Sequence, residues 1–427
     1  MAMQSDLSTI TVTAPHTVAE PTATHFWESA RQLGCPAALW RLPNQQEKHL
    51  IIHLTDVLPR VSADLEELPA GFAVSPFDNL DNGPDNPART LFLRADVHVV
   101  FSEGTITQLN YASGHQAEAL QRLVSQQLNN PPTSKFNSIA TKTMADGDAQ
   151  SLYEQNVAEA VAEMQQERFR KVVLSRTKRV EFDETPDVVA IFDKLCLTYP
   201  TAFVSAVFLP ERGQVWISAT PERLVSVDDK GIFRTLSLAG TQSAFDAAGQ
   251  PKRPSEAMWS QKEIEEQALV SRYIIECFKK IRLREYLEEG PKTIIAGNLM
   301  HLGTRFSVDT QAVRYPQLGT VMLRLLHPTS AVCGMPRDAA YEFIRTHEPH
   351  DRELYSGFLG PVNVANEHGG PESHLFVHIR CLKLEGNVAT LYAGAGLTED
   401  SVPEREWQET EMKCQTLLNV LTSVTKK

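Results

Sequence analysis

Hydrophobic and polar residues along the chain change between helical and strand periodicity several times. Apolar residues spaced three and four apart predict helices at 26–33, 152–168, 188–197, 260–281 and 337–346. Short apolar or alternating runs predict strands at 50–54, 97–101, 171–176, 202–209, 215–219, 223–227, 374–380 and 388–393, and one more that ends at 238–241. This mixture favours an α+β fold, in which antiparallel sheets carry helices on the outside.

Three of the predicted strands follow one another closely. The connections between 202–209, 215–219 and 223–227 are too short to contain a crossover helix, so we expect antiparallel pairing in sequence order. Ahead of these strands, Thr185 and Pro186 predict a helix start, with Thr185 as the N-cap and Pro186 at the first helical position.

Two stretches have the composition of segments without regular structure. Residues 1–24 are rich in Thr, Ser, Ala and Pro and contain neither a basic region nor an apolar core, which predicts a flexible tail and not a secretory signal. Residues 129–147 are rich in Asn, Pro, Ser and Thr and form the best candidate for a linker. Between them, residues 25–128 contain no recognisable catalytic constellation.

Composition narrows the class of protein. The chain has 427 residues, of which 42% are hydrophobic and 22% charged, as in an ordinary globular protein. Its formal charge of −12 argues against nucleic acid or an anionic membrane as a partner, because both require a basic surface. The six cysteines are widely spaced and predict reduced thiols in a cytoplasmic protein, and no apolar run is long enough for a membrane span.

One spacing of carboxylates occurs twice. Glu406 and Glu409 stand at i and i+3 of a predicted helix, with Lys413 four residues further on, and Glu263 and Glu266 repeat the spacing on the helix at 260–281. Each pair alone is more often a solvated helix surface. The repetition, and the absence of nearby His or Cys ligands, favours a site for a hard cation such as Mg²⁺.

The residues ahead of the predicted helix that carries Glu406 and Glu409 are mostly small. The run Gly394, Ala395, Gly396 and Leu397 would let backbone N–H groups approach an anion closely, in the manner of an anion nest. An anionic ligand bridged to a divalent cation would fit a site made of the carboxylate pairs and this run of small residues.

Several other residues are candidates for chemistry, and each has a structural alternative. Lys171 begins a strand and would serve as a general base only if burial or a nearby cation lowered its pKa. Glu222 follows Pro221 in a turn, and burial would raise its pKa as a general acid requires. Arg380 could grip a carboxylate or form a structural ion pair. The histidines at 301 and 327 could equally be satisfied core residues.

Eight motifs together carry more information than any of these residues alone. In chain order they are Lys171-Val172-Val173-Leu174-Ser175-Arg176, Thr220-Pro221-Glu222-Arg223-Leu224, Leu238-Ala239-Gly240-Thr241, Lys262 through Glu266, His327-Pro328-Thr329, Arg352 through Gly357, Gly394-Ala395-Gly396 and Glu406-Trp407-Gln408-Glu409-Thr410. In this order and at these separations the chain resembles the chorismate-utilising enzymes, and most closely the isochorismate synthases. The match is strong over residues 150–427 and weak before them.

The resemblance implies a fold, a substrate and a reaction. The fold would be a single chorismate-binding α+β unit over 25–427, in which 25–150 is a divergent part, 151–427 carries the motifs and the linker becomes an internal loop. The enzyme would be an isomerase that reversibly adds water at C2 of chorismate with loss of the C4 hydroxyl. The product, isochorismate, would feed menaquinone or catechol siderophore biosynthesis.

The resemblance also assigns roles to residues of this chain. Lys171 would activate the water and Glu222 would protonate the leaving hydroxyl. Glu266 and Glu409 would hold Mg²⁺ directly, and Glu263 and Glu406 would hold metal-bound waters. Substrate contacts would come from Gly240, Thr241, His301, Tyr355, Arg380, Gly394, Ala395, Gly396 and Lys413.

Other activities of the same family remain alternatives. Enzymes that use ammonia, such as anthranilate synthase component I, typically lack a lysine at the position of Lys171. Salicylate synthases keep that lysine and also eliminate pyruvate, but their segment corresponding to His327-Pro328-Thr329 more often reads Phe-Pro-Ser. We expect chorismate as the small-molecule partner, no nucleic acid and no membrane, and a monomer, with a weak dimer as the alternative.

Overall fold

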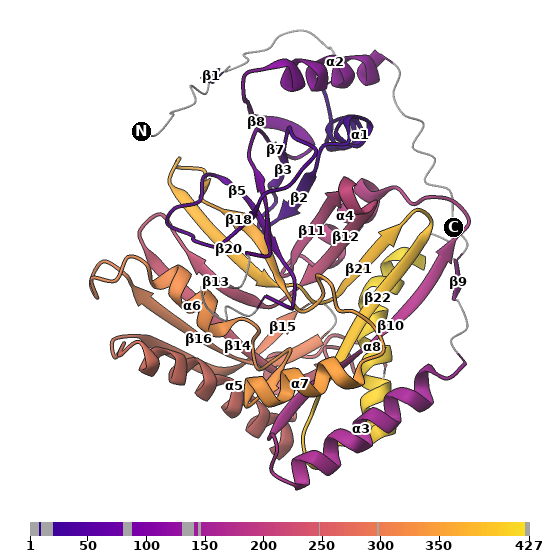
Figure 1. The fold of residues 1–427 in the computed structure, drawn as a ribbon, viewed down its shortest axis with the longest axis vertical. Coiled ribbons are helices and arrows are strands. Elements are labelled where there is room, and N and C mark those ends of the chain that lie inside the picture. Colours follow the sequence, from indigo (N-terminus) through magenta and orange to yellow (C-terminus); the bar gives the residue numbers. More distant parts are fainter. Residues whose placement is uncertain are drawn as a thin grey trace.

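Two large antiparallel sheets form the body of the protein in a computed structural model (Figure 1). The model describes residues 8–9, 20–79, 88–129, 141–143, 147–246, 248–296 and 299–422. The 12-stranded sheet has the order β1 (Ser8–Thr9), β8 (Thr105–Tyr111), β7 (Val97–Ser102), β3 (Lys48–Ile52), β2 (Ala37–Arg41), β11 (Phe203–Leu209), β12 (Gln214–Thr220), β21 (Cys381–Glu385), β22 (Val388–Leu397), β10 (Lys171–Phe182) and β17 (Gly334–Met335), with β9 (Thr141–Thr143) also on β10.

The second sheet has ten strands. Their order is β15 (Leu287–Ala296), β16 (Leu299–Asp309), β14 (Ile232–Ser243), β13 (Arg223–Val227), β20 (Pro371–Val377), β18 (Phe358–Val362), β5 (Gly71–Ser75), β6 (Thr90–Arg94) and β4 (Arg60–Val61), with β19 (Val364–Ala365) on β20. Because β2 pairs with β11 and β5 pairs with β18, both sheets combine strands from before and after the predicted linker. Most of that linker, residues 130–140, lies outside the described residues.

Large aromatic residues fill the space between the two sheets. Phe203 of the 12-stranded sheet stacks on Phe376 of the ten-stranded sheet, with ring centroids 4.1 Å apart and planes 5° apart. Trp40, Phe72 and Trp216 belong to the same buried cluster. Burial of such side chains contributes about 1.5–3 kcal/mol each, so this central layer is a main source of the stability that holds the sheets together.

Helices cover the outer faces of the sheets. Residues of α1 (Ala23–Leu33), α2 (His115–Asn129), α4 (Val188–Thr198) and α8 (Pro403–Thr422) pack in a core with the 12-stranded sheet. Residues of α5 (Gln261–Lys280) and α6 (Leu318–Leu326) pack on the ten-stranded sheet, and α3 (Ala149–Gln165) and α7 (Arg337–His347) pack beside β10. The α+β class with helices outside antiparallel sheets is therefore confirmed.

Several predictions about local structure are wrong. β12 and β13 do not pair, because the chain passes from one sheet to the other at Thr220-Pro221-Glu222; Pro221 has no N–H for a ladder, and the Glu222 carbonyl accepts from Val377 of β20 instead. Helix α4 is capped by Asp187, whose Oδ1 accepts from the Ala190 N–H at 3.0 Å, and not by Thr185.

Two further differences concern the ends of strands. β20 ends at Val377, so Arg380 lies beyond it, in a turn with a left-handed φ of 49°. Gly394–Leu397 form the end of β22 and pair with β10, so they are extended and do not make an anion nest, which needs consecutive N–H groups on one side. Ala23 and Thr24, predicted as tail, form the first turn of α1.

All six cysteines are free thiols and buried, as predicted for reduced thiols. Among the described helices, none combines the length and the apolar composition that a membrane span requires.

Candidate active site

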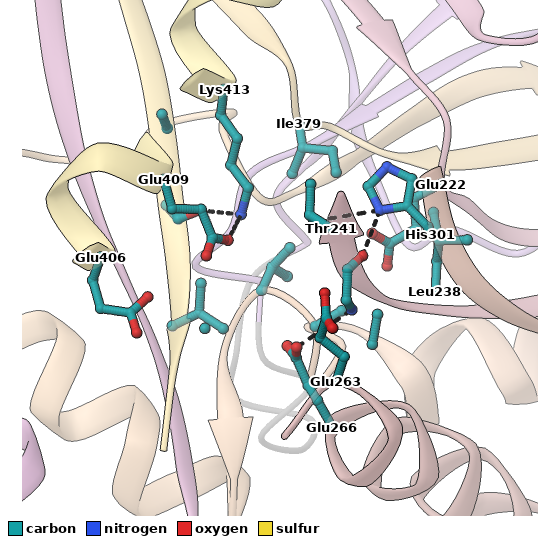
Figure 2. A pocket seen from close by; sticks show the side chains of 18 of the residues that line it. Glu222, Leu238, Thr241, Glu263, Glu266, His301, Ile379, Glu406, Glu409 and Lys413 are labelled. Carbon is teal, nitrogen blue, oxygen red and sulfur yellow. Dashed lines mark hydrogen bonds and ion pairs between the residues drawn. The ribbon is translucent and has the colours of Figure 1, made fainter. Parts of the chain in front are cut away.

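A cavity of about 420 Å³ separates α5 from α8 (Figure 2). Its walls come from the first two turns of α5, from the first three turns of α8, from the end of β14, from β22 and from the crossing at Pro221 and Glu222. All the predicted site residues except two line it: Glu222, Gly240, Thr241, Glu263, Glu266, His301, Tyr355, Arg380, Gly394, Gly396, Glu406, Glu409 and Lys413. Segments separated by more than 180 residues of sequence therefore meet in one place.

The two exceptions lie on neighbouring strands. Ala395 is fully buried and belongs to a hydrophobic cluster with Leu174, because successive side chains of a strand point to opposite faces. Its predicted place among the substrate contacts is not supported. Lys171 is also buried, 1% exposed, and lies behind the cavity wall, from which its Nζ donates to Glu266 Oε1 at 2.8 Å.

The carboxylates on the two helices face the same cavity from opposite sides (Figure 2). Among the described residues, no three His, Cys, Asp or Glu side chains are gathered as ready-made metal ligands. Instead Glu266 pairs with Lys171 at 2.8 Å, Glu409 with Lys413 at 2.7 Å and Glu406 with Lys262 at 3.1 Å. The donors are carboxylate oxygens alone, so the set fits a hard cation such as Mg²⁺ in chemistry and in its shared cavity.

The fourth carboxylate is engaged at the start of α5. Glu263 Oε2 accepts from the Ser260 N–H at 2.8 Å, and the Ser260 hydroxyl accepts from the Glu263 N–H in return, which makes a capping box. The Gln242 side-chain amide also donates to Glu263, at 3.2 Å. Glu263 therefore fixes the helix end that carries Glu266 into the cavity.

Helix α8 is fixed in the same way by β10. The guanidinium of Arg176 lies 3.8 Å from the centre of the Trp407 ring, and its Nε donates to Thr410 Oγ1 at 2.7 Å. Arg176 and Lys178 both pair with Glu411. These contacts occupy the side of α8 that faces β10, and Glu406, Glu409 and Lys413 line the cavity from the same helix.

Glu222 is a strongly perturbed carboxyl in the cavity. It is 6% exposed, and burial raises its pKa to about 7, although Lys171, Lys413 and Arg380 oppose the rise. Its backbone N–H donates to Thr220 Oγ1 at 3.3 Å, and that hydroxyl donates to the Val377 carbonyl at 2.8 Å. A carboxyl that is half protonated near neutral pH can donate a proton. Burial therefore gives Glu222 the raised pKa that a general acid requires.

Glu266 is perturbed in the opposite direction. Burial alone would raise its pKa, but Lys171, Lys413 and Lys262 hold the pKa below the ordinary value. Two carboxyl groups in one cavity are thus pushed apart in pKa, one towards the acid form and one towards the carboxylate. Such a separation suits Glu222 to proton transfer and Glu266 to carrying negative charge.

His301 offers the cavity an acceptor and not a charge. Its Nδ1 donates to the Gly240 carbonyl at 2.7 Å, so Nε2 carries the lone pair, and this buried atom has no partner among the described residues. Burial first, and then the charge of Arg380, lowers the pKa of His301 to about 3. A neutral acceptor at this place suits the hydroxyl of a ligand.

Cations and a phenol complete the walls. The buried guanidinium of Arg380 is held by one donation to Thr416 Oγ1 at 3.0 Å, and the Lys413 Nζ donates to the Gly394 carbonyl at 2.7 Å. Tyr355 stacks on Tyr392 with centroids 5.4 Å apart, and burial raises the pKa of its phenol. A Cβ at Gly394 would stand 2.8 Å from the Tyr355 hydroxyl, so the glycine admits that hydroxyl.

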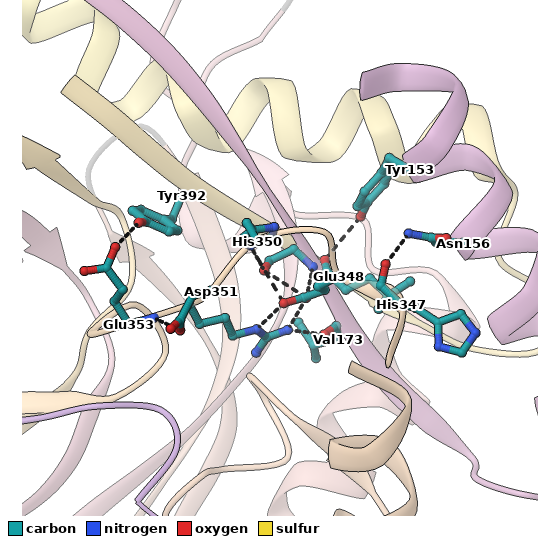
Figure 3. A network of polar contacts seen from close by, with 12 residues as sticks. Tyr153, Asn156, Val173, His347, Glu348, His350, Asp351, Glu353 and Tyr392 are labelled. Atoms are coloured by element: carbon teal, nitrogen blue, oxygen red, sulfur yellow. Dashed lines mark hydrogen bonds and ion pairs between the residues drawn. The ribbon is translucent and has the colours of Figure 1, made fainter. Parts of the chain in front are cut away.

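A buried ion pair supports this wall from behind (Figure 3). Glu348 accepts from the Ser175 N–H at 2.6 Å and from Arg352 Nε at 2.7 Å, and Arg352 also donates to the carbonyls of Val173 and Val332, each at 2.7 Å. Val173 and Val332 line the cavity, whereas the ion pair does not. The Glu348–Arg352 pair thus fastens β10 to the loop after α6.

Sequence reasoning assigned no role to some residues that line the cavity. Lys262 was part of a recognised motif, and its spacing of four from Glu266 could have marked it. Leu238 and Ile379 supply apolar wall, but isolated apolar residues carry no distinctive signal (Figure 2). His327 is buried with a pKa lowered by burial to about 4, and it lies outside the cavity lining.

Together the fold and the cavity define an α+β protein with a polar, cation-bearing pocket suited to a small anionic ligand. Comparison with known proteins identifies its family. Residues 89–422 match the family model described as "Chorismate binding enzyme". The chain belongs to this family of enzymes.

The relatives found by sequence are isochorismate synthases. The chain is 32% identical over 272 residues to isochorismate synthase EntC of Escherichia coli K12, which is 64% of this chain and 67% of that protein. It is 30% identical over 291 residues to MenF of the same organism, covering 66% of this chain and 58% of MenF. A third, from Pseudomonas aeruginosa and named for salicylate biosynthesis, is 31% identical over 288 residues and spans 66% of this chain and 57% of that protein.

Solved structures agree on the fold. The menaquinone-specific isochorismate synthase MenF from Escherichia coli superposes with a TM-score of 0.70 at 22% identity, over 93% of this chain and 91% of that one. A putative 2,3-dihydroxybenzoate-specific isochorismate synthase from Bacillus anthracis gives 0.69 at 21% identity, over 92% and 99%. The resemblance inferred from the eight motifs is therefore confirmed.

Proposed function

We propose that this protein is a Mg²⁺-dependent isochorismate synthase that acts in the cytoplasm. The observation that carries the proposal is Glu222, a buried carboxyl with a pKa raised by burial to about 7, in a cavity that also presents lysine and arginine cations. The identity of the relatives supports the same reaction. Its product would serve menaquinone or catechol siderophore biosynthesis.

Binding of chorismate would rest on the cations of the cavity. Chorismate carries two carboxylates, and the buried Arg380 and the partly buried Lys413 would receive them through charge-assisted hydrogen bonds. The unpartnered Nε2 of His301 would accept from a ring hydroxyl. Leu238 and Ile379 would exclude water from the apolar edge of the ring.

The reaction exchanges one hydroxyl for another. Lys171, as the free amine, would remove a proton from the water that attacks C2, and the ring double bonds would shift as the C4 hydroxyl leaves. Glu222 would give its proton to that hydroxyl, which departs as water. In the reverse direction Glu222 would act as the base and Lys171 as the acid, so the two groups return to their starting protonation states.

Four carboxylates of this chain would hold the metal. Glu266 and Glu409 would bind it directly, and Glu263 and Glu406 through water, with the lysines that now pair with three of them making way. When bound, Mg²⁺ would supply positive charge that neutralises a substrate carboxylate.

Product analysis tests the proposal. The full chain incubated with chorismate and MgCl₂ should yield isochorismate on chromatography, and added EDTA should abolish its formation. Recovery of chorismate alone would overturn the function. Salicylate with pyruvate would instead identify a salicylate synthase, and an aminated product formed only with ammonium would identify an aminating enzyme.

Replacing Gly396 by alanine should lower the rate of isochorismate formation. A Cβ at this position would stand 2.9 Å from Glu266 Oε1 and 3.4 Å from Lys171 Cε, so it would push apart the pair that the proposal uses. A displacement of about 1 Å in a reacting group can cost about 10²-fold, and we expect a loss of at least about tenfold in kcat. Gly147→Ala, where no atom lies within 4 Å of the added Cβ, is the control. An unchanged kcat in Gly396→Ala would show that the Lys171–Glu266 pair need not be held closely.

A further inference from the structure

Lys262 is a cation of the cavity for which the proposed reaction has no use. It is the second residue of α5, and its Nζ donates to Glu406 Oε1 of α8 at 3.1 Å. The side chain is 42% exposed, in contrast to 3% for Glu406, so a largely buried carboxylate is neutralised by an ammonium that reaches in from the cavity mouth. This contact joins the two carboxylate-bearing helices directly.

Three carboxylates of the cavity each pair with one lysine. Glu266 has Lys171 and Glu409 has Lys413, and both of these lysines have a part in the proposed reaction. Glu406 has Lys262 alone among the ion pairs of the described residues. Partial burial would lower the pKa of Lys262, but Glu406, Glu409 and Glu266 raise it, so three of the four proposed metal-binding carboxylates act on this one ammonium.

We propose that Lys262 is a built-in competitor of the divalent cation: it occupies Glu406 and must release that carboxylate before the cation can use it. The inference rests on the proposed function, because it takes the four glutamates as the metal site. Lys262 does not contact substrate in this account; it sets how tightly the cation binds.

Electrostatics gives the direction of the effect. The ammonium of Lys262, 3.1 Å from Glu406, opposes a second positive charge at the same place, and loss of Lys262 also frees Glu406 from its ion pair. Because the ammonium is partly exposed, solvent screens this opposition, and we expect about a tenfold change in affinity and not a larger one. Removal of the charge should tighten cation binding.

Calorimetric titration of Mg²⁺ into the full chain tests the inference without any turnover. Lys262→Met, which keeps the length of the side chain and removes the charge, should lower the Kd for Mg²⁺ about tenfold. Lys262→Arg, which keeps the charge, should bind Mg²⁺ as the wild type does. Lys280→Met makes the same charge change at the exposed far end of α5 and should leave the Kd within about twofold.

The outcomes separate the inference from the proposed function. If the wild type binds Mg²⁺ and Lys262→Met binds it no more tightly, the competitor role is wrong and the metal site stands. If Lys280→Met tightens binding as much as Lys262→Met, the effect is one of net charge and the specific role is wrong. If the wild type binds no Mg²⁺ either alone or with chorismate, both proposals fall. Circular dichroism of each variant confirms that it is folded before titration.

Discussion

Glu222→Gln should reduce kcat for isochorismate formation by about 10²–10⁴-fold, because the leaving hydroxyl loses its proton donor and general acid catalysis typically contributes that much. Glutamine keeps the size and hydrogen-bonding shape of the side chain, and the site is buried, so chorismate affinity should change little. Glu66→Gln makes the same substitution at a carboxylate that bonds to Thr320 and does not line the cavity, and it should retain full activity.

The raised pKa of Glu222 predicts how kcat/KM depends on pH. The pKa of Glu222 is raised by burial to about 7, so the acid form that donates the proton predominates below pH 7 and is lost above it. With Lys171 unprotonated across this range, as the proposed mechanism requires, a plot of log(kcat/KM) for the wild type should fall with a slope approaching −1 above about pH 7, and the residual rate of Glu222→Gln should lack this fall. A wild-type profile that stays level to pH 9 would remove Glu222 from the role of general acid.

The position that gives Glu222 this environment could not be predicted from the sequence. A strand, a three-residue connection and a second strand normally form a hairpin, and local pattern contains no information about which sheet the second strand joins. Here Thr220 is the last residue of β12 and bonds to Val377 of the other sheet, so the chain crosses between sheets at Pro221 and buries the next carboxyl. The local sequence thus predicted correctly that Glu222 lies between two strands, but its burial depends on tertiary structure.

Other parts of the site were predictable because their geometry is local. A helix places residues three and four apart on one face whatever surrounds it, which is why Glu406, Glu409 and Lys413 were correctly grouped from spacing alone. The conformation of Gly394–Leu397 was not local, because it depends on pairing with β10 far away in the sequence. The burial of Lys171 likewise depends on Gly396 and Glu266, which only the folded chain brings to it.

Lys171→Ala should lose about 10²–10⁴-fold in the rate of water addition while still binding chorismate, because the amine that activates the water is gone and the proposed carboxylate contacts remain. The burial of Lys171 makes the choice of variants important. Its Nζ holds Glu266 at 2.8 Å, and the pKa of Glu266 is kept low partly by this charge, so alanine alone would also disturb the proposed metal site. Lys171→Gln, which retains a donor to Glu266, should be as inactive as alanine if the lysine is the base.

Lys178→Gln provides the matched control for this variant. Lys178 lies on the same strand and also pairs with a glutamate, Glu411, at 2.8 Å, but Glu411 does not line the cavity, whereas Glu266, the partner of Lys171, does. Loss of an ion pair on β10 is thus common to both substitutions, whereas loss of an amine beside the substrate belongs to Lys171 alone. Chorismate binding, measured by titration calorimetry, should match the wild type in Lys171→Ala, Lys171→Gln and Lys178→Gln.

Chemical rescue separates a base from a structural lysine. In Lys171→Ala the space left by the side chain adjoins Glu266 and Gly396, so a small primary amine such as methylamine could occupy it and accept the proton of the attacking water. The rate of isochorismate formation should then rise with methylamine concentration, and more steeply at higher pH, where more of the added amine is unprotonated. Rescue by methylammonium that is independent of pH would mean that Lys171 supplies positive charge and that another group activates the water.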